Sequence, residues 1–328
     1  MKVVITGGAG FIGGQLARRL TQLGQLTGPS GKPEKIDAIT CFDMVVPDKP
    51  FAGLDARTEF IAGEISDRAT VKKLFDRPDL SVFHLASVVS GGGELDFDLA
   101  MRVNLDGHLH VLESARALGS RPRVVFASSI AVFGGKGMPK QVGDNTKQVP
   151  QTTYGMTKAI GELLVNDYSR KGFLDGRSAR LPTVIIRPGK PNKAASSFAS
   201  GVFREPLNGV PCVLPVGYDA VMPLAGYRTI VEGFIRLHEV DGGALGEDRA
   251  VSLPSLDVTV GDMVAGLKRV AGNRHLGEIT VEKDPVIERI VASWPTGTQY
   301  ERALKLGLPK DTHLDSIIKA YIEDFLGG

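Results

Sequence analysis

The chain has 328 residues, of which 42% are hydrophobic and 23% charged, a composition typical of a globular protein. Its 39 basic and 37 acidic side chains leave a net charge of +2, and no basic stripe is interleaved with aromatic residues, so we expect no nucleic acid as partner. The first residues resemble neither a signal peptide nor a membrane span, so we expect a cytoplasmic protein that does not bind membranes. Cys41 and Cys212 lie in separate apolar runs, and the six histidines show no ligand spacing, which predicts buried free thiols and no metal site.

The chain begins with a pattern that predicts a phosphate-binding turn. Residues 2–6 (KVVIT) predict a buried strand, the next segment is rich in glycine, and residues 15–24 have helical periodicity. Glycines at such a turn let the backbone approach a pyrophosphate, and the helix N-terminus offers free N–H groups. Two spacings fit: Gly8, Gly10 and Gly13 match the common dinucleotide pattern, while Gly7, Gly10 and Gly13 match a three-spaced variant.

A second strand is expected over residues 36–42, after a polar segment at 25–35 that reads as a surface loop. Asp43 ends this strand. A carboxylate there can accept hydrogen bonds from the adenosine ribose and would repel a 2′-phosphate, which favours NAD over NADP. A plain loop carboxylate is the alternative.

Strands and helices then alternate, which predicts an α/β fold with a doubly wound parallel sheet, the Rossmann architecture. We expect a strand from residue 60 that passes into a helix ending near 76, strands over 81–86, 123–129 and 181–187, and helices over 96–118 and 150–171. Shorter elements follow: helices over 196–208, 224–238 and 260–271 and from 314, and strands over 212–216, 249–253 and 278–281. Residues 1–180 should form the NAD-binding domain, to which 181–190 and 224–253 could return, and 191–328 mainly a smaller α/β C-terminal substrate lobe.

Tyr154 and Lys158 stand four residues apart on a predicted helix, so both side chains face the same way. A free phenol is a poor base at neutral pH, but a nearby cation lowers its pKa. The pair can therefore abstract a proton, although the same spacing also arises by chance in many helices.

In combination, these segments resemble the extended short-chain dehydrogenase/reductase family. The similarity spans nearly the whole chain and rests on TGGAGFIGG at 6–14, HLAS at 84–87, VNLDG at 103–107, ASSIAVFGG at 127–135, YGMTK at 154–158 and RPGKPN at 187–192. The resemblance implies that Tyr154 is the general acid/base, that Lys158 binds the nicotinamide ribose, and that Ser129 holds the substrate oxygen. The cofactor-binding residues that it implies are Gly7, Gly10, Phe11, Ile12, Gly13, Asp43, Glu64, Ile65, Leu85, Ala86, Asn104, Ser128, Tyr154, Lys158 and Pro188.

Within that family, segments 88–107, 154–177, 181–209 and 290–295 resemble the branch that oxidises four-carbon sugar acids. This implies an NAD-dependent oxidation of D-erythronate at C2 to 2-dehydro-D-erythronate. A small acid needs a carboxylate-binding group, and arginine is favoured for it. The candidate substrate residues are Ser90, Ser129, Tyr154, Asn192, Ser197 and Arg228.

Two other functions stay open: a nucleotide-sugar epimerase of the same family, and a non-catalytic dinucleotide sensor. The sensor would be expected to lose the Ser–Tyr–Lys set, which this chain keeps. By family analogy, the helices at 95–118 and 150–171 would form the four-helix interface of a homodimer.

Overall fold

The computed structural model describes residues 1–49, 51–191 and 194–327. Its centre is a parallel sheet of seven strands in the order β13-β9-β7-β6-β1-β4-β5. The strands are β1 (Lys2–Thr6), β4 (Ala38–Asp43), β5 (Thr58–Ala62), β6 (Leu80–His84), β7 (Arg123–Ser129), β9 (Asp175–Leu181) and β13 (Ala250–Ser252). The strand order reverses between β1 and β6. In open α/β sheets, a ligand binds beside the carboxyl ends of the strands at such a point.

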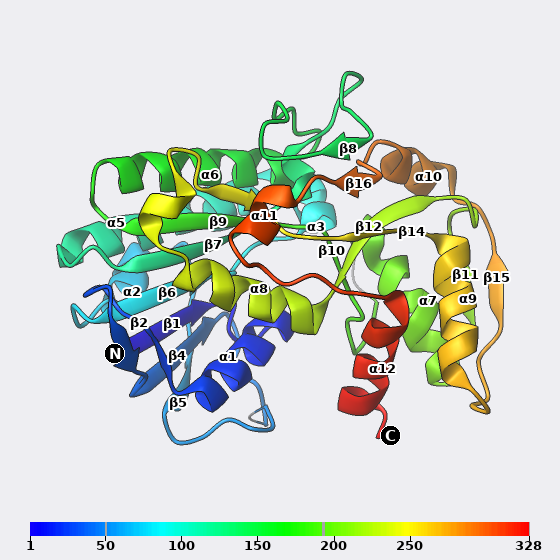
Figure 1. The fold of residues 1–328 in the computed structure, drawn as a ribbon, viewed down its shortest axis with the longest axis horizontal. Coiled ribbons are helices and arrows are strands. Elements are labelled where there is room, and N and C mark those ends of the chain that lie inside the picture. Colours follow the sequence, from blue (N-terminus) through cyan, green and yellow to red (C-terminus); the bar gives the residue numbers. More distant parts are fainter. Residues whose placement is uncertain (50, 192–193, 328) are drawn as a thin grey trace.

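Helices cover both faces of this sheet (Figure 1). Helices α1 (Phe11–Leu23) and α8 (Tyr227–Glu239) share one apolar core with Val3 and Ile5 of β1. Helices α2 (Arg68–Lys73), α5 (Gly107–Leu118) and α6 (Thr153–Arg170) share another core with Val4, on the opposite face. Successive side chains of a strand point to opposite faces, so the continuous apolar run of β1 serves both cores. The predicted doubly wound sheet is confirmed.

A second lobe lies at one end of the central sheet, on the right in Figure 1. It contains a three-stranded sheet in the order β10-β12-β14 and a two-stranded sheet of β11 and β15, and it has an apolar core of its own. Its strands are β10 (Thr183–Ile185), β11 (Cys212–Leu214), β12 (Val221–Gly226), β14 (Leu256–Thr259) and β15 (Ile279–Val281). Its helices are α7 (Phe198–Leu207), α9 (Val260–Ala271), α10 (Pro285–Ala292) and α12 (Leu314–Phe325).

Short elements complete the chain. These are the strands β2 (Gln25–Thr27), β3 (Pro33–Lys35), β8 (Gln141–Val142) and β16 (Gly297–Thr298), the helices α3 (Ser90–Leu95), α4 (Phe97–Ala100) and α11 (Glu301–Lys305), the π-helix η1 (Met101–Asp106), and the 3₁₀ turns η2 (Ile130–Val132), η3 (Ala195–Ser197) and η4 (Gly242–Leu245). Within the described ranges, no helix combines the length and the apolar character that crossing a membrane requires.

The structure differs from the sequence-based expectation where the chain leaves the central sheet. The strand expected over 181–187 is two strands: β9 ends at Leu181 in the central sheet, and β10 begins at Thr183 in the small sheet. Pro182 separates them, and proline has no N–H to continue a ladder. Residues 224–226, expected to be helical, are the end of β12, and the loop expected over 25–35 contains the β2–β3 hairpin.

The helix expected over 96–118 is divided into α4, η1 and α5. Asp96 starts the first of these because its side chain accepts a hydrogen bond from the Leu99 N–H at 2.8 Å. Asp67 caps α2, as expected at the end of the preceding strand segment. Thr152 caps α6, which therefore begins at Thr153 and not at the expected residue 150.

Candidate active site

The glycine turn between β1 and α1 leaves room for a phosphate. Gly7 has a φ of +73°, and a Cβ on Gly13 would lie 2.2 Å from the Gly7 carbonyl oxygen. At Gly7, a Cβ would lie 2.9 Å from the backbone nitrogen of Ala86, which follows β6. Gly10 caps α1 without a side-chain hydrogen bond, so the first N–H groups of the helix have no side-chain acceptor there. These residues fit the pyrophosphate of a dinucleotide.

Asp43 is the last residue of β4 and lies against this turn. One carboxylate oxygen accepts a hydrogen bond from the Ala9 N–H at 3.1 Å, and the other accepts from the Met44 N–H at 2.8 Å. Each carboxylate oxygen has a further lone pair. The carboxylate is therefore fixed beside the phosphate turn and can still accept from a ribose hydroxyl.

The other predicted cofactor residues lie around the same edge. Ile65 is buried against Gly107, Glu64 is exposed just after β5, and Leu85, Ala86 and Pro188 are half-buried. The ring of Phe11 packs on that of Tyr227, at the start of α8, with centroids 5.1 Å apart.

Asn104 supports a loop of this edge. Its side-chain oxygen accepts from the Val88 N–H at 2.7 Å and its amide nitrogen donates to the Val88 carbonyl at 3.0 Å. It also accepts from the Ser87 hydroxyl at 3.1 Å and donates to Thr157 of α6. The Asn104 amide therefore ties the loop after β6 to α6.

The start of α6 places Tyr154 beside Ser129. Thr152 caps the helix by accepting from the Gly155 N–H at 3.0 Å, which puts Tyr154 in the first turn. Gly155 lies so close to the turn after β7 that a Cβ there would be 2.1 Å from the Ala131 carbonyl oxygen. The Ser129 hydroxyl, at the end of β7, accepts from the Ala131 N–H at 3.1 Å and also interacts with the phenol. Glycine at position 155 therefore allows the start of α6 to lie against the turn after β7.

Lys158 lies one turn further along α6 and is 3% exposed. Its ammonium donates a hydrogen bond to the Ala127 carbonyl at 2.7 Å. It stands 5.4 Å from the centroid of the Tyr154 ring and 4.8 Å from that of Phe126. The structure therefore brings the three predicted catalytic side chains together at the carboxyl end of β7.

Burial acts on both ionisable groups of this set. It raises the pKa of the Tyr154 phenol, while the hydrogen bond with Ser129 and the charge of Arg187 lower it. Burial lowers the pKa of Lys158 to about 7, against the opposing charge of Glu162. The sequence predicts Lys158 as a cation that favours the phenolate, and the charge of Arg187 is a further influence that lowers the Tyr154 pKa.

A buried polar network lies beneath the set, and the sequence-based reasoning missed most of it. The carboxylate of Glu162 is 2% exposed and accepts from the Arg180 guanidinium at 2.8 and 2.9 Å. It also accepts from the hydroxyl of Ser128 and from the amide of Gln148. Glu162 follows Lys158 by four residues, and that spacing is the signal by which it could have been found.

The predicted substrate residues lie in different parts of the structure. Ser90, at the start of α3, and Ser197, at the end of η3, are half-buried, whereas Asn192 lies outside the described residues. Arg228 is engaged in ion pairs. Its guanidinium donates to Asp324 at 3.0 Å and to Glu323 at 3.0 Å, both on α12.

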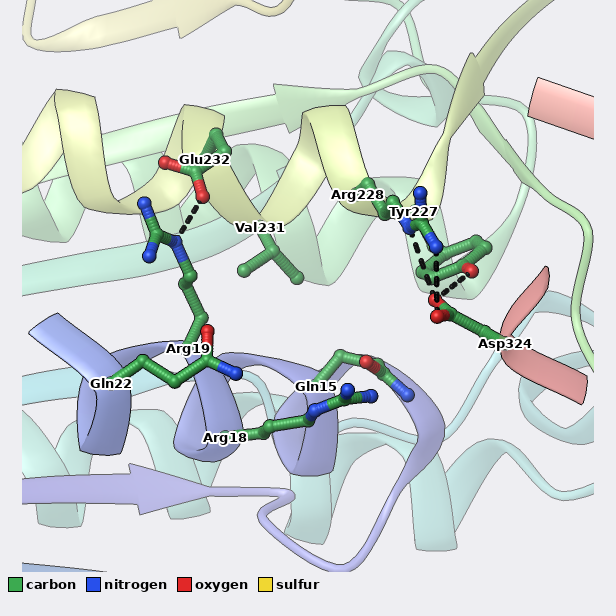
Figure 2. Close-up of a pocket in the computed structure, with 9 residues that line it drawn as sticks. All are labelled: Gln15, Arg18, Arg19, Gln22, Tyr227, Arg228, Val231, Glu232 and Asp324. Carbon is green, nitrogen blue, oxygen red and sulfur yellow. Dashed lines mark hydrogen bonds and ion pairs between the residues drawn. The ribbon is translucent and has the colours of Figure 1, made fainter. Parts of the chain in front are cut away.

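Figure 2 shows Arg228 and Tyr227 turned toward Asp324 in a cavity of about 240 Å³ between α1, α8 and α12. The lining of that cavity contains neither Ser129 nor Tyr154. Two carboxylates already bind the guanidinium there, which disfavours Arg228 as the group that binds the substrate carboxylate.

Comparison with known proteins gives full-length relatives. The chain is 50% identical over 325 residues to a D-erythronate dehydrogenase of Cupriavidus necator, covering 99% of this chain and 98% of the relative. It is 40% identical over 323 residues to one of Haemophilus influenzae, covering 98% and 99%. A crystal structure described as a nucleoside-diphosphate-sugar epimerase from Agrobacterium tumefaciens superposes with a TM-score of 0.91 at 40% identity, covering 100% of this chain and 95% of that one.

The family comparison agrees with the parallel sheet and with a glycine turn that fits a dinucleotide. Residues 3–248 match the NAD dependent epimerase/dehydratase family, a range that runs from within β1 to beyond α8. The match covers well over half of the chain. This protein therefore belongs to the NAD-dependent epimerase/dehydratase family.

Proposed function

We propose that this protein oxidises D-erythronate at C2 to 2-dehydro-D-erythronate with NAD as the oxidant. The observation that carries the proposal is the placement of Ser129, Tyr154 and Lys158 at one edge of the sheet, next to a glycine turn that fits a dinucleotide. The similarity to two D-erythronate dehydrogenases over nearly the whole chain supports the choice of substrate.

The chemistry divides between cofactor and protein. NAD, when bound, supplies the acceptor for the hydride that leaves C2. Tyr154, as phenolate, takes the proton from the C2 hydroxyl and becomes a phenol. Ser129 orients the same oxygen by hydrogen bonding, and Lys158 would hold the nicotinamide ribose. The Gly7–Gly13 turn and Asp43 would hold the pyrophosphate and the adenosine ribose.

The surroundings of Tyr154 have two opposing effects on this step. Burial disfavours the phenolate, while Ser129 and the Arg187 charge favour it. A general base contributes on the order of 100-fold or more to a reaction of this kind. The phenol should therefore be indispensable for turnover and dispensable for the fold.

The test is an assay of NADH formation by absorbance with D-erythronate and, separately, with its C2 epimer. We expect NADH with D-erythronate, and a loss of about 100-fold or more in kcat for Tyr154→Phe. NAD binding by the variant, measured by calorimetry, controls for folding. Absence of NADH with both epimers contradicts the proposed substrate, and a variant that keeps more than about a tenth of kcat contradicts the role of Tyr154.

A nucleotide-sugar epimerase is the second candidate, because the Agrobacterium structure carries that description. An epimerase returns the hydride to its substrate, so it forms no net NADH. A shift in melting temperature with UDP-sugars but not with tetronates, together with epimer formation and no NADH, would favour that function. NAD binding without turnover of either substrate class would favour a dinucleotide sensor.

The proposal includes a cytoplasmic homodimer. Helices α5 and α6 lie side by side on one face of the sheet (Figure 1). Leu163 of α6 is 63% exposed, and Leu105, Leu109 and Ile160 on the same helical layer are half-buried. A second copy packed on this face would cover those apolar side chains.

A further inference from the structure

We propose that Phe126 is a positioning residue for the reaction, because the face of its ring holds the Lys158 ammonium beside Tyr154. This inference rests on the proposed function, which gives Lys158 its role at the nicotinamide ribose. Phe126 lies on β7, the strand that ends at Ser129, and is 2% exposed. A phenyl ring has no acid, base or hydrogen-bonding group to offer the reaction, so Phe126 acts through the lysine.

The Lys158 ammonium is held by a hydrogen bond and by two aromatic rings. It donates to the Ala127 carbonyl at 2.7 Å. Its nitrogen lies 4.8 Å from the centroid of the Phe126 ring and 5.4 Å from that of Tyr154. A cation within about 6 Å of a ring centroid is attracted by the negative face of the ring. Two consecutive residues of β7 therefore fix the ammonium, one through its ring and the next through its carbonyl.

The Phe126 ring is itself packed from several elements. Its centroid lies 4.3 Å from that of His108 on α5 and 5.7 Å from that of His84 on β6. On α6, Gly161 lies so close that a Cβ there would be 2.7 Å from two carbons of the ring. Because α5, α6 and β6 all pack against the ring, it offers the ammonium a fixed position.

A neutral ring suits this place better than a carboxylate would. Lys158 is 3% exposed, and an ammonium removed from water needs compensation to stay charged. A cation–π contact provides that compensation, and it is strongest where water is excluded. A carboxylate in the same position would also stabilise the ammonium, but its negative charge would disfavour the phenolate of Tyr154. The ring supports the cation without adding charge beside the base.

Charged groups on α6 and β9 also act on the lysine. Glu162 lies one turn beyond Lys158 on α6 and opposes the lowering of its pKa by burial. The carboxylate of Glu162 is shared with Arg180 of β9, which binds it at 2.8 Å. Tyr154 lies one turn before Lys158. These groups are unchanged when only the Phe126 ring is altered, so its effect can be measured separately.

The two histidines around the ring do not titrate together with the lysine. Burial above all holds the pKa of His84 well below its ordinary value and lowers that of His108 to about 3. Burial lowers the pKa of Lys158 to about 7. Both histidines are therefore neutral over the range in which Lys158 changes its charge.

The decisive experiment weakens the face of the ring and keeps its packing. Fluorine withdraws electron density, so replacing Phe126 by monofluoro-, trifluoro- and pentafluorophenylalanine weakens the attraction for a cation stepwise. The pKa of the Lys158 amine is followed by carbon NMR in protein with isotope-labelled lysine, with the signal assigned through Lys158→Met. We expect this pKa to fall with each step, by about one unit at the last, because the charged form loses stabilisation.

Phe83 is the matched control. It is buried in the same sheet, on β6, and its ring packs on His238 with centroids 5.3 Å apart, in the core on the opposite face. The same fluorination there should leave the Lys158 pKa unchanged. Phe126→Met fills much of the space without a π face, so it should lower that pKa as the fluorinated series does. An unchanged pKa in the Phe126 series, or an equal fall in the Phe83 series, would overturn the proposal.

A second readout connects the ring to turnover and separates this proposal from the proposed substrate. With D-erythronate, the alkaline limb of kcat/KM should move to lower pH by about one unit in Phe126→Met, because less of the lysine is charged. An equal loss at every pH, with the limb in place, would show a merely structural role and contradict the proposal. The NMR titration needs no substrate. If the wild type oxidises no tetronate while the fluorinated series lowers the Lys158 pKa, the substrate assignment fails and the hold of Phe126 on Lys158 stands.

Discussion

The buried pair of Glu162 and Arg180 offers the sharpest test of how this site is supported. Both side chains are at most 4% exposed, and the pair is joined through two guanidinium nitrogens. Glu162→Gln keeps the volume but removes the negative charge, and its amide group would face donors from Arg180, Gln148 or Ser128. Arg180 would then be a buried cation without its main partner.

Breaking a buried pair costs about 3–5 kcal/mol, and we expect the lower end because Asp144 also lies 3.6 Å from Arg180. At about 2 °C per kcal/mol, the melting temperature of Glu162→Gln should fall by about 6 °C. Arg180→Met should cost a similar amount. The double variant removes both charges, so its loss should be smaller than the sum by about 2 kcal/mol or more.

Urea unfolding of the wild type, the two single variants and the double variant, followed by circular dichroism, measures this coupling. Single losses that add within about 0.5 kcal/mol would refute the reasoning, because they would show that the two charges do not stabilise each other. Glu162 also opposes the lowering of the Lys158 pKa. In Glu162→Gln that pKa should therefore fall below about 7, and less of the lysine should be charged at neutral pH.

Two further predictions concern α6. Burial lowers the Lys158 pKa to about 7, so below that pH its amine is charged in both the folded and the unfolded state, and the folded state bears the full cost of burying the charge. As pH rises toward the ordinary lysine pKa, the folded protein loses that proton first and the cost falls. Lys158→Met should therefore abolish turnover. In the absence of NAD it should also stabilise the protein against urea unfolding, by more at about pH 6 than at about pH 9. A variant that is less stable than the wild type at the lower pH would contradict this. Light scattering should give a dimer for the wild type and a monomer for Leu163→Glu, because Leu163 is 63% exposed on the proposed interface. A wild type that is already monomeric would contradict the dimer.

Local patterns were sufficient to predict every strand of the central sheet except β9. The glycine turn after β1, the carboxylate at the end of β4 and the complete span of β7 are readable because glycine spacing and apolar runs are properties of neighbouring residues. Strand β9 was missed because it contains Arg177 and Arg180. Both are buried, and partners from distant segments satisfy them: the His238 carbonyl binds Arg177, and Glu162 binds Arg180.

The candidate site was predictable to the same extent. Ser129, Tyr154 and Lys158 belong to motifs with fixed spacing, and the structure places them together. The surroundings of Arg228 could be seen only in three dimensions, because they depend on which carboxylates lie beside its guanidinium. Residues 228 and 324 are far apart in sequence, so no local pattern could reveal their ion pair.

Pro182 marks the point at which the chain passes from the central sheet to the second lobe, and this affects how the two parts could be separated or exchanged. The chain leaves the central sheet at that residue, returns through α8 and β13, and leaves again at β14. No single cut separates a cofactor-binding half from a substrate-binding half. A truncation near residue 182 would remove an entire covering helix, α8, and an edge strand, β13. Exchange of substrate lobes between related enzymes would thus require several crossovers at once, so new specificity is more accessible by point substitution within the existing lobe.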